Sequence, residues 1–482
     1  MAAWIVCALC AVVIIKPQEF VPQLVGFPLV YVLFAAAILL CAIDVVRRRV
    51  RPALAPQVPF VVAFLAWALL TTAVKRPDAL EQQAILAAIV ACVFGLMAVG
   101  LSSPTGIRAF SVTFLACAVA VSAVALKQGF SPYGCMLGAP EDWEGKGELE
   151  HDGRPCETVL DCRKDAPVPD GNYRCEKVGP WATSSIGGRV RYRGSLADPN
   201  ELSLMTAMAI PFALAMAERR KRVPEAAKGN APGLPHLMSD RLISRVSGML
   251  RGIPVAALIA AMGVVVVLAE SRTGLIVFLL VLGLYFVRRA GAWGIVGGCL
   301  VGPPMLLLGG RSGAEAEQSS DERVELLREA LDLIRETKGI GVGAGQFADH
   351  SSIGLTAHNA YVLAGAETGI IGMFLFGFVV YLSLKVPIAI WFGKYEVGDT
   401  VRRLAPALAV GLCAAATGIL FLSWAYKDIL YMFFGASAAL YAVARSEDPN
   451  VRVRLSLKEA FLVCLGMVGL LVALYVAARI RG

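Results

Sequence analysis

Apolar stretches of about 20 residues recur along most of this chain, and they constrain its fold more than any other feature. Of the 482 residues, 57% are hydrophobic and only 17% are charged. A soluble protein of this length needs more charge to solvate its surface, whereas a helix in lipid satisfies its own backbone hydrogen bonds. The composition therefore predicts an all-α, polytopic integral membrane protein, and the apolar runs predict about 12–13 transmembrane helices with two large loops on the outer side of the membrane.

The first apolar run is short and lacks a small-residue cleavage motif, so we interpret it as a retained span and not as a signal peptide. The last run adds a span that would place the C-terminus on the side opposite to the N-terminus. In chain order, the predicted spans cover residues 2–15, 25–46, 57–74, 84–101, 109–126, 200–217, 253–269, 274–287, 291–309, 359–384, 404–424, 428–444 and 459–478.

Short basic segments set the predicted orientation. Arginine-rich segments follow the second, sixth and eighth spans, precede the eleventh, and lie between the twelfth and thirteenth. All of them fall on one side of the membrane, and short cytoplasmic loops are enriched in Lys and Arg, so this side is predicted to be the cytoplasm. The formal net charge of +8 is then mostly a topology signal, and we do not interpret it as nucleic-acid binding.

Two long segments are predicted to face outward and to divide the spans into groups. The predicted regions are N-terminal spans (1–126), a Cys-containing loop (127–199), central spans (200–309) with a basic cytoplasmic linker (218–251), a second loop (310–357) and C-terminal spans (358–482).

The second outward segment holds a helical pattern and then a glycine-rich one. Apolar residues at helical spacing predict an amphipathic helix over 320–337 that ends at Lys338-Gly339. The run Gly341-x-Gly343-x-Gly345-x-Phe347 resembles a dinucleotide fingerprint only superficially, because the strand and helix that flank such a site are missing. We interpret it as a series of tight turns.

Cysteine placement separates the first outward segment from the rest of the chain. Four of the twelve cysteines lie there, namely Cys135, Cys156, Cys162 and Cys175, and the others lie in or against apolar spans. Four cysteines confined to one outward segment predict two disulfides, with three possible pairings that the sequence leaves open. A zinc site that includes His151 is the alternative, but the spacing has no Cys-x-x-Cys pair.

Polar residues gather at the predicted outer mouths of three spans, where an arginine needs an anion or another partner. Guanidinium groups suit phosphate because they bind it in a bidentate manner and keep their charge. The segments are Arg189-x-Arg191-x-Arg193 with Asn200 before the sixth span, Glu270-Ser271-Arg272 between the seventh and eighth, and His358-Asn359 at the tenth.

Each of these residues also has a purely structural interpretation. Arg193 could reach lipid headgroups or pair with Asp198. Asn359 could be a helix N-cap, and His358 an interfacial polar residue. Glu367 could be the partner of an arginine on another span. Because all of these residues are predicted to lie on the same outer face, a functional site is favoured over separate structural roles.

An ordered set of motifs over roughly residues 190–384 is similar to the O-antigen ligase and O-antigen polymerase superfamily. The set comprises Arg193-Gly194-x-x-x-Asp198-Pro199-Asn200, Ser271-Arg272-Thr273-Gly274, Arg323, the glycine run to Phe347, His358-Asn359-x-Tyr361 and Glu367-x-Gly369-Ile370-Ile371-Gly372. The resemblance implies a glycosyltransferase-type ligase or polymerase of the bacterial inner membrane that contributes to lipopolysaccharide or exopolysaccharide. Its implied substrates are a polyprenyl-diphosphate glycan and an acceptor hydroxyl on the periplasmic side, and it implies no cofactor.

Carried onto this chain, the resemblance implies that Arg193 and Arg272 bind the diphosphate and that His358 acts on the acceptor hydroxyl. Arg323 is a further candidate for contact with phosphate or glycan. The other predicted substrate-binding residues are Asn200, Asn359 and Glu367. An imidazole can accept the acceptor's proton, and fixed guanidinium groups can stabilise the departing diphosphate. A single displacement of this kind would invert the anomeric centre. Because no Asp-x-Asp or clustered His/Asp motif points to a metal, the reaction is also predicted to be metal-independent.

Two other classes of protein compete with a transferase. A transporter or flippase of a lipid-linked glycan is the main alternative, and a scaffold is the third. Transporters often show inverted repeats and ionisable residues near the midplane. Here the charges gather at the outer mouths and no repeat is visible, which favours a transferase. The choice between ligase and polymerase stays open, and the Cys-containing loop lies outside the resemblance.

Overall fold

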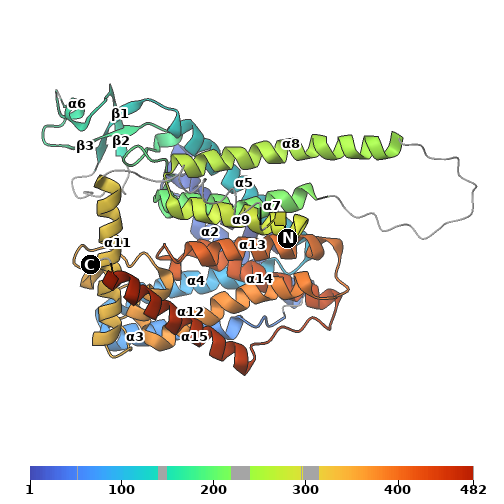
Figure 1. The fold of residues 1–482 in the computed structure, drawn as a ribbon. Coiled ribbons are helices and arrows are strands. Elements are labelled where there is room, and N and C mark those ends of the chain that lie inside the picture. The colour runs from blue at the N-terminus through green and yellow to red at the C-terminus, as the bar shows by residue number, and fades with distance from the viewer. Residues whose placement is uncertain are drawn as a thin grey trace, which may run out of the picture.

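The computed structural model describes residues 1–50, 53–138, 149–164, 166–218, 239–291, 293–294, 296 and 314–480 as a helical bundle (Figure 1). Among these residues, nine helices are long and apolar enough to cross a membrane. This confirms the predicted all-α, multi-pass class. The helices of the bundle are α1 (Ala2–Ile15), α2 (Leu29–Val46), α3 (Val58–Lys75), α4 (Leu80–Gly100), α5 (Pro104–Gly129), α7 (Pro199–Ala217), α8 (Ser239–Leu268), α9 (Arg272–Ala290), α12 (Ala360–Phe392), α13 (Asp399–Gly418), α14 (Asp428–Glu447) and α15 (Leu457–Ile480).

The helices follow the predicted spans closely, and α8 is the main departure. It begins at Ser239, inside the predicted linker 218–251, and Figure 1 shows it projecting beyond the other helices. Most of the predicted span 291–309 lies outside the described residues, so that span stays a prediction.

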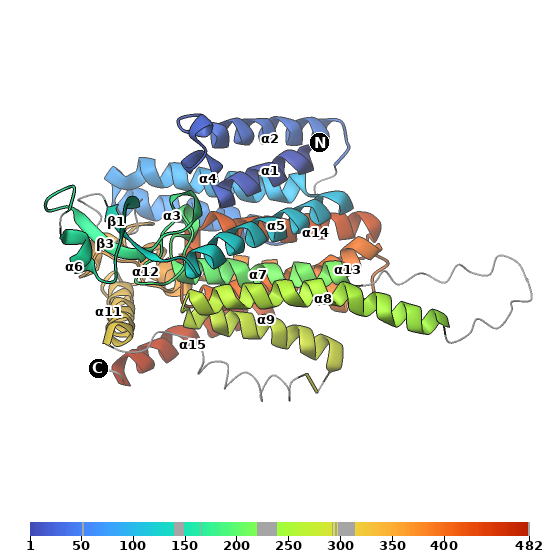
Figure 2. The same ribbon diagram turned by 90° about the horizontal axis from the view of Figure 1, so that it is seen from above.

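Helices α7 and α14 form the centre of the bundle. In their most apolar windows, 78% and 89% of residues are buried, against 17% in α2 and 6% in α15, which are peripheral. Phenylalanines of α5, α7 and α14 pack in the core with ring centroids 4.8–6.2 Å apart, namely Phe110, Phe114, Phe212 and Phe433. Figure 2 shows α1 and α2 along one side of the bundle and α8 and α9 along the other. Helix α7 is therefore packed on several sides, by α5, α8, α9 and α13.

Helix α11 (Ala314–Glu336) confirms the predicted amphipathic helix and lies across one end of the bundle. It stands upright beside the bundle helices in Figure 1 and is seen nearly end-on in Figure 2. Leu326 and Ala330 are fully buried against the bundle. The Arg328 guanidinium donates to the carbonyl of Ala478 in the last turn of α15, at 2.6 Å for the shorter contact. Both an apolar face and a polar tie thus fix α11 to the spans.

A break in α12 explains the glycine-rich run. At Gly369 the backbone leaves the helical region (φ 72°, ψ −177°), which frees hydrogen-bonding groups on both sides of the break. The Ile370 amide donates to Gly339 O (2.9 Å) instead of to the carbonyl one turn back, and the carbonyls of residues 366 and 367 accept from Val342 (3.1 Å) and Gly343 (2.8 Å). Buried backbone groups must find partners, and the glycine segment supplies them.

Close approach of two backbones requires glycine on both sides of this contact. A Cβ at Gly341 would lie 2.3 Å from Glu367 O, and one at Gly369 would lie 2.2 Å from Gly339 O. Residues 339, 341, 343 and 345 all have positive φ, as tight turns require. The turn interpretation of the run is confirmed.

A small antiparallel sheet stands beside the helices, in a segment that is predicted to be a loop. Its strand order is β2 (Leu149–Pro155), β1 (Tyr133–Gly138), β3 (Asn172–Lys177). Disulfides join Cys135 to Cys162 and Cys156 to Cys175, which confirms the predicted disulfides and selects one of the three pairings. Three of these sulfur atoms also have metal-ligand spacing, but a sulfur in a disulfide is no thiolate ligand. We refer to residues 133–177 as the disulfide module.

The short helix α6 (Val159–Arg163) packs on β3 within the disulfide module. Thr158 and Asp161 form a capping box at its start, with reciprocal side-chain and backbone hydrogen bonds. The backbone amides of Thr158 and Glu157 donate to the Asp161 carboxylate at 2.8 and 3.0 Å and lower the pKa of that carboxyl. Charge on Asp161 therefore stabilises the start of α6.

Candidate functional site

A cavity of about 390 Å³ opens where α7, α9, α11 and α12 meet, and it collects most of the predicted site residues. Asn200, Arg272, Arg323, His358 and Asn359 all line it. Five predicted site residues that are far apart in the sequence thus line the same cavity. The remaining lining residues are Arg189, Glu270, Thr273, Ile276, Ser319, Ser320, Val324, Leu327, Ala357, Leu420, Phe421 and Leu474.

Three helix N-termini point at this cavity. Asn200 lies in the first turn of α7, Arg272 is the first residue of α9, and Asn359 is the N-cap of α12. Each helix N-terminus carries roughly half a positive elementary charge, because its first amides lack helical partners. The backbone alone therefore makes the cavity favourable for an anion, before any side chain is counted.

Three arginines add full positive charges to the same cavity. Arg189 comes from the segment before α7, Arg272 from α9 and Arg323 from α11. Glu270 is the one carboxylate among the lining residues. The Arg189 Nε donates to Ala269 O (3.0 Å), and the Val190 amide donates to Leu268 O (3.2 Å), which fixes this segment to the end of α8. The side chains thus make an electropositive cavity with an apolar rim of Leu420, Phe421 and Leu474.

Ser271 joins two of the three helix starts. Its hydroxyl donates to Asn200 Oδ1 (2.8 Å) and accepts from the Gly274 amide (2.9 Å), so one side chain caps α9 and ties it to α7. Ser271 and Asn200 are nearly fully buried, with 2% and 5% of their surfaces exposed. The Arg272 side chain therefore extends from a rigid junction between α7 and α9.

The start of α12 is fixed in a similar way. Asn359 Oδ1 accepts from the Tyr361 and Val362 amides (3.0 and 3.1 Å), which confirms its interpretation as an N-cap. The Ala360 amide donates to Ile419 O (2.9 Å) after the end of α13. His358, the residue before this cap, is half-buried and faces the cavity.

Two cavity residues have left-handed backbone conformations that residues other than glycine rarely adopt. Glu270 has φ 49° and His358 has φ 47°. Such conformations cost about 1–3 kcal/mol and persist only where the surrounding structure imposes them. They gather at active sites, so their presence at both sides of this cavity supports a functional interpretation.

Arg193 and Glu367 lie away from the cavity lining. The Arg193 guanidinium donates to Trp181 O and lies over the Phe20 ring, 5.1 Å from its centroid. Glu367 is 2% exposed, and its Oε1 accepts from the Phe347 amide (3.3 Å). It lies eight residues along α12 from Asn359, about 12 Å down the axis. Diphosphate binding by Arg193 stays a prediction, and Glu367 contacts the glycine segment.

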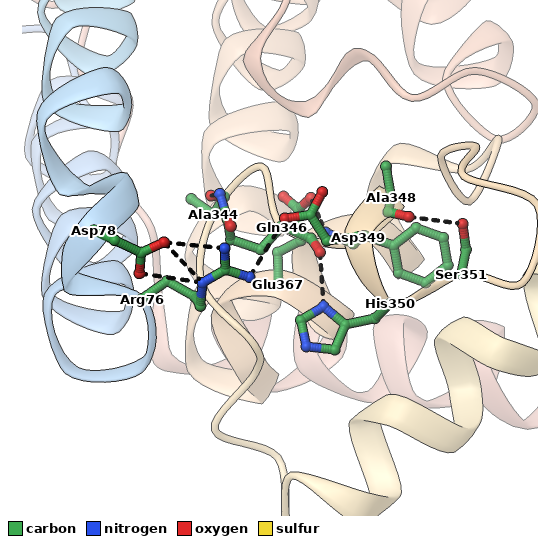
Figure 3. A network of polar contacts seen from close by, with 10 residues as sticks. Arg76, Asp78, Ala344, Gln346, Ala348, Asp349, His350, Ser351 and Glu367 are labelled. Atoms are coloured by element: carbon green, nitrogen blue, oxygen red, sulfur yellow. Dashed lines mark hydrogen bonds and ion pairs between the residues drawn. The ribbon is translucent and has the colours of Figure 1, made fainter.

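The loop that leads to His358 is held by a separate polar network (Figure 3). Arg76, just after α3, pairs with Asp78 (3.1 Å) and with Asp349 (3.3 Å). The hydrogen bonds and charge of Asp78 raise the pKa of Arg76 further. The ring of His350 bonds the Gln346 carbonyl through Nδ1 (2.9 Å), as Figure 3 shows. This network attaches the loop to α3 and contains none of the cavity-lining residues.

Of three alternating arginines, the structure places Arg189, and not the predicted Arg193, in the lining of this cavity. Arg189, Arg191 and Arg193 alternate, so they could share one face of an extended segment. In the structure Arg189 lines the cavity, while Arg191 is buried and donates through Nε to Ser184 O (3.0 Å). The backbone contact of Val190 with α8 decides which arginine faces the cavity, and the sequence holds no sign of that contact.

Comparison with known proteins agrees with this geometry. Residues 257–377 match a protein-family model described as O-antigen ligase. Over this segment, the match supports assignment to the O-antigen ligase superfamily. No curated protein matches the chain in a sequence search.

The O-antigen ligase segment contains the features that build the cavity. It holds Arg272, Arg323, His358 and Asn359, and it also holds the broken part of α12 with its glycine run. Arg193 and Asn200 precede it. The family segment therefore supplies most of the positive charge and the imidazole, and α7 supplies the wall against which they are arranged.

Proposed function

We propose that this protein transfers a glycan from a polyprenyl-diphosphate carrier to an acceptor hydroxyl. The observation that carries the proposal is one cavity in which three arginines, three helix N-termini and one imidazole converge. A diphosphate is the anion for which such a site is suited, because guanidinium groups bind phosphate oxygens in pairs and amides at helix starts add to the field. The apolar rim of Leu420, Phe421 and Leu474 suits the lipid end of the carrier.

In the proposed reaction, the acceptor oxygen attacks the anomeric carbon of the glycan. The bond from that carbon to the diphosphate oxygen breaks, and polyprenyl diphosphate leaves with the bonding electron pair. His358 takes the acceptor's proton. Attack on the face opposite to the leaving group inverts the anomeric centre.

The arginines act on the leaving group. Negative charge grows on the diphosphate oxygen as the bond breaks, and fixed positive groups in a partly enclosed cavity stabilise it without reorganisation. Arg272 and Arg323 approach from different helices, which allows them to contact the two phosphates separately. These side chains and the helix starts supply the positive charge that a divalent cation supplies in other transferases, so we propose a metal-independent reaction.

We place the cavity on the periplasmic side of a bacterial inner membrane. Two features support this orientation. Arg288 lies in the last turn of α9, Arg402 in the first turn of α13 and Arg445 in the last turn of α14. All three lie at helix ends remote from the cavity, as expected for residues next to cytoplasmic loops. The disulfide module belongs to the cavity end of α5 and α7, and disulfides persist in an oxidising compartment.

The proposal is tested by reconstituting the purified protein with a synthetic polyprenyl-diphosphate glycan and an acceptor. We expect formation of a new glycosidic bond with loss of the lipid-linked donor. A ligase moves the glycan to a different molecule, whereas a polymerase lengthens the lipid-linked glycan. Passage of intact donor across the membrane, with no new bond, would identify a transporter instead.

Matched variants make the test specific. His358→Ala should lower turnover by about 10²–10⁴-fold, as expected for loss of a general base. His350→Ala removes a histidine of the same loop that lies outside the cavity lining, and should leave turnover near that of the unmodified protein. Arg323→Ala should cost about 10²–10³-fold, and exposed Arg335 on the same helix serves as its control. Full activity of both Arg272→Ala and His358→Ala would refute the mechanism, and loss of activity with a chelator that Mg²⁺ restores would refute metal independence.

A further inference from the structure

An apolar groove runs along the outside of α3 and α4, away from the candidate site. It encloses about 740 Å³, and small or aliphatic side chains line it almost throughout, including Val62, Leu69, Ala84 and Ala91. Val62 is 61% exposed at its edge, and a Cβ added at Gly95 would meet no atom within 4 Å. The groove is therefore an open channel on the face of the bundle and not a packing defect between buried helices.

A second, cationic pocket adjoins one end of this groove. It encloses about 420 Å³ between the start of α3, the end of α14 and the start of α15, and Leu54 lines both the groove and this pocket. Arg445 and Arg454 line it. The Arg445 guanidinium donates to the Tyr441 hydroxyl (2.8 Å), and the Arg454 carbonyl accepts from Lys385 Nζ (2.7 Å). Both arginines are thus held at the mouth of the groove.

Neither guanidinium group of this pocket forms an ion pair within the described part of the chain. Among the residues that the structure describes, no carboxylate oxygen lies within 4.0 Å of the Arg445 or Arg454 guanidinium. Guanidinium groups at a membrane surface attract anionic headgroups. An anion seated here would complete the pocket, and the groove that adjoins it would take an apolar chain.

The length of the groove can be compared with the length of a lipid acyl chain. Its lining spans Val58 to Leu69 on α3, about 17 Å, and Ala84 to Val99 on α4, about 22 Å, at 1.5 Å per residue. Half of a bilayer's hydrocarbon core is about 15 Å thick. Both lengths exceed this value, so the groove has room for the whole of an acyl chain of one leaflet.

We propose that Arg445 and Arg454, together with the α3–α4 groove, form a binding site for one anionic glycerophospholipid of the leaflet opposite to the candidate active site. The phosphate contacts the two guanidinium groups, and an acyl chain lies in the groove. The site is independent of the cavity at α7, α9, α11 and α12, because it lies at the other end of α14 and α15.

The test uses the full-length protein in detergent, with thermal unfolding and native mass spectrometry as readouts. Phosphatidylglycerol and phosphatidylcholine with identical acyl chains are added in parallel. We expect phosphatidylglycerol to be retained and to raise the unfolding temperature more than phosphatidylcholine does. Soluble glycerol phosphate is the third arm, and it should not stabilise, because it has no chain for the groove. Equal stabilisation by the two lipids, or full stabilisation by glycerol phosphate, would overturn the proposal.

Two variants address the headgroup and the chain separately. Replacing both arginines, Arg445→Gln with Arg454→Gln, should weaken retention of phosphatidylglycerol by about tenfold or more, because charge-assisted hydrogen bonds to phosphate are lost. Arg452→Gln is the control, since Arg452 is exposed on the same segment and does not line the pocket.

For the chain, Gly95→Leu places a side chain in the groove, and because its Cβ meets no atom within 4 Å, we expect the fold to be kept. It should weaken the retention of both lipids. Gly466→Leu on α15 also points into open space, but outside the groove, and should change nothing. The same lipid preference in the double arginine variant, or equal effects of the two glycine variants, would refute the site.

Discussion

The hydroxyl of Ser271 offers the sharpest test of how the candidate site is built. It caps α9 through the Gly274 amide and holds Asn200 of α7 at the same time. Arg272 is the next residue, so its position depends on both bonds. Ser271→Ala removes the two bonds with the loss of a single atom and creates almost no cavity.

The size of the effect follows from the two bonds. Loss of an N-cap costs about 0.5–2 kcal/mol. Leaving the buried Asn200 Oδ1 without this donor costs about 1–3 kcal/mol. The sum is about 1.5–5 kcal/mol of local stability at the junction of α7 and α9. Displacement of a catalytic group by about 1 Å can lower a rate by roughly 100-fold, so we expect turnover to fall by about 10–100-fold.

Ser103 provides a matched control. It caps α5 by accepting from the Gly106 amide (3.0 Å), in the same Ser-x-Thr-Gly arrangement, but at the α4–α5 turn and away from the cavity. Ser103→Ala should lower stability by about 1 kcal/mol and leave turnover unchanged. Ser271→Thr keeps a hydroxyl and should recover most of the activity. Glycan transfer and thermal unfolding are measured on all three variants, and equal turnover of Ser271→Ala and Ser103→Ala would refute the reasoning.

Three further predictions concern the break in α12 and the disulfide module. Gly369→Ala should lower thermal stability by about 2–5 kcal/mol through backbone strain and overlap with Gly339 O, and should abolish glycan transfer, whereas Gly466→Ala should do neither. Replacing Cys135 by Ser should lower the unfolding temperature only under oxidising conditions, so a difference that survives reductant would contradict it. The pKa of Asp161 is lowered in the fold, so its charge stabilises α6 above the ordinary value of 3.8, and this stabilisation is lost as the pH falls through the lower folded value. The destabilisation by Asp161→Asn, measured by thermal unfolding, should therefore be present at neutral pH and shrink in acid; a constant difference would count against it.

The spans could be predicted from the sequence because lipid demands long apolar helices, and few other patterns meet that demand. The disulfide module could not. Its strands are only six or seven residues long and are held by cystines whose pairing the sequence leaves open. The cystines were predicted correctly, but the sheet they stabilise was treated as a loop.

The sequence predicts a site residue well when its place in a helix fixes its position. It predicts less well when a tertiary contact decides which side chain faces the cavity. Arg272 and Asn359 start helices, and these helix starts could be read from the sequence. The choice between Arg189 and Arg193 depends on a backbone contact with α8, which leaves no pattern in the sequence. Glu367 is predicted to bind substrate from the resemblance, and the axial rise of α12 places it about 12 Å from Asn359 and outside the cavity lining, so that role stays a prediction.

The left-handed backbones of Glu270 and His358 have a practical consequence for anyone who wants a more robust version of this protein. A common way to raise thermal tolerance is to replace such residues with glycine, which adopts positive φ without steric conflict. At these two positions the exchange would relax the main chain and remove the side chains that the cavity presents. Stabilising designs should therefore leave both residues unchanged and look for gains in the peripheral helices.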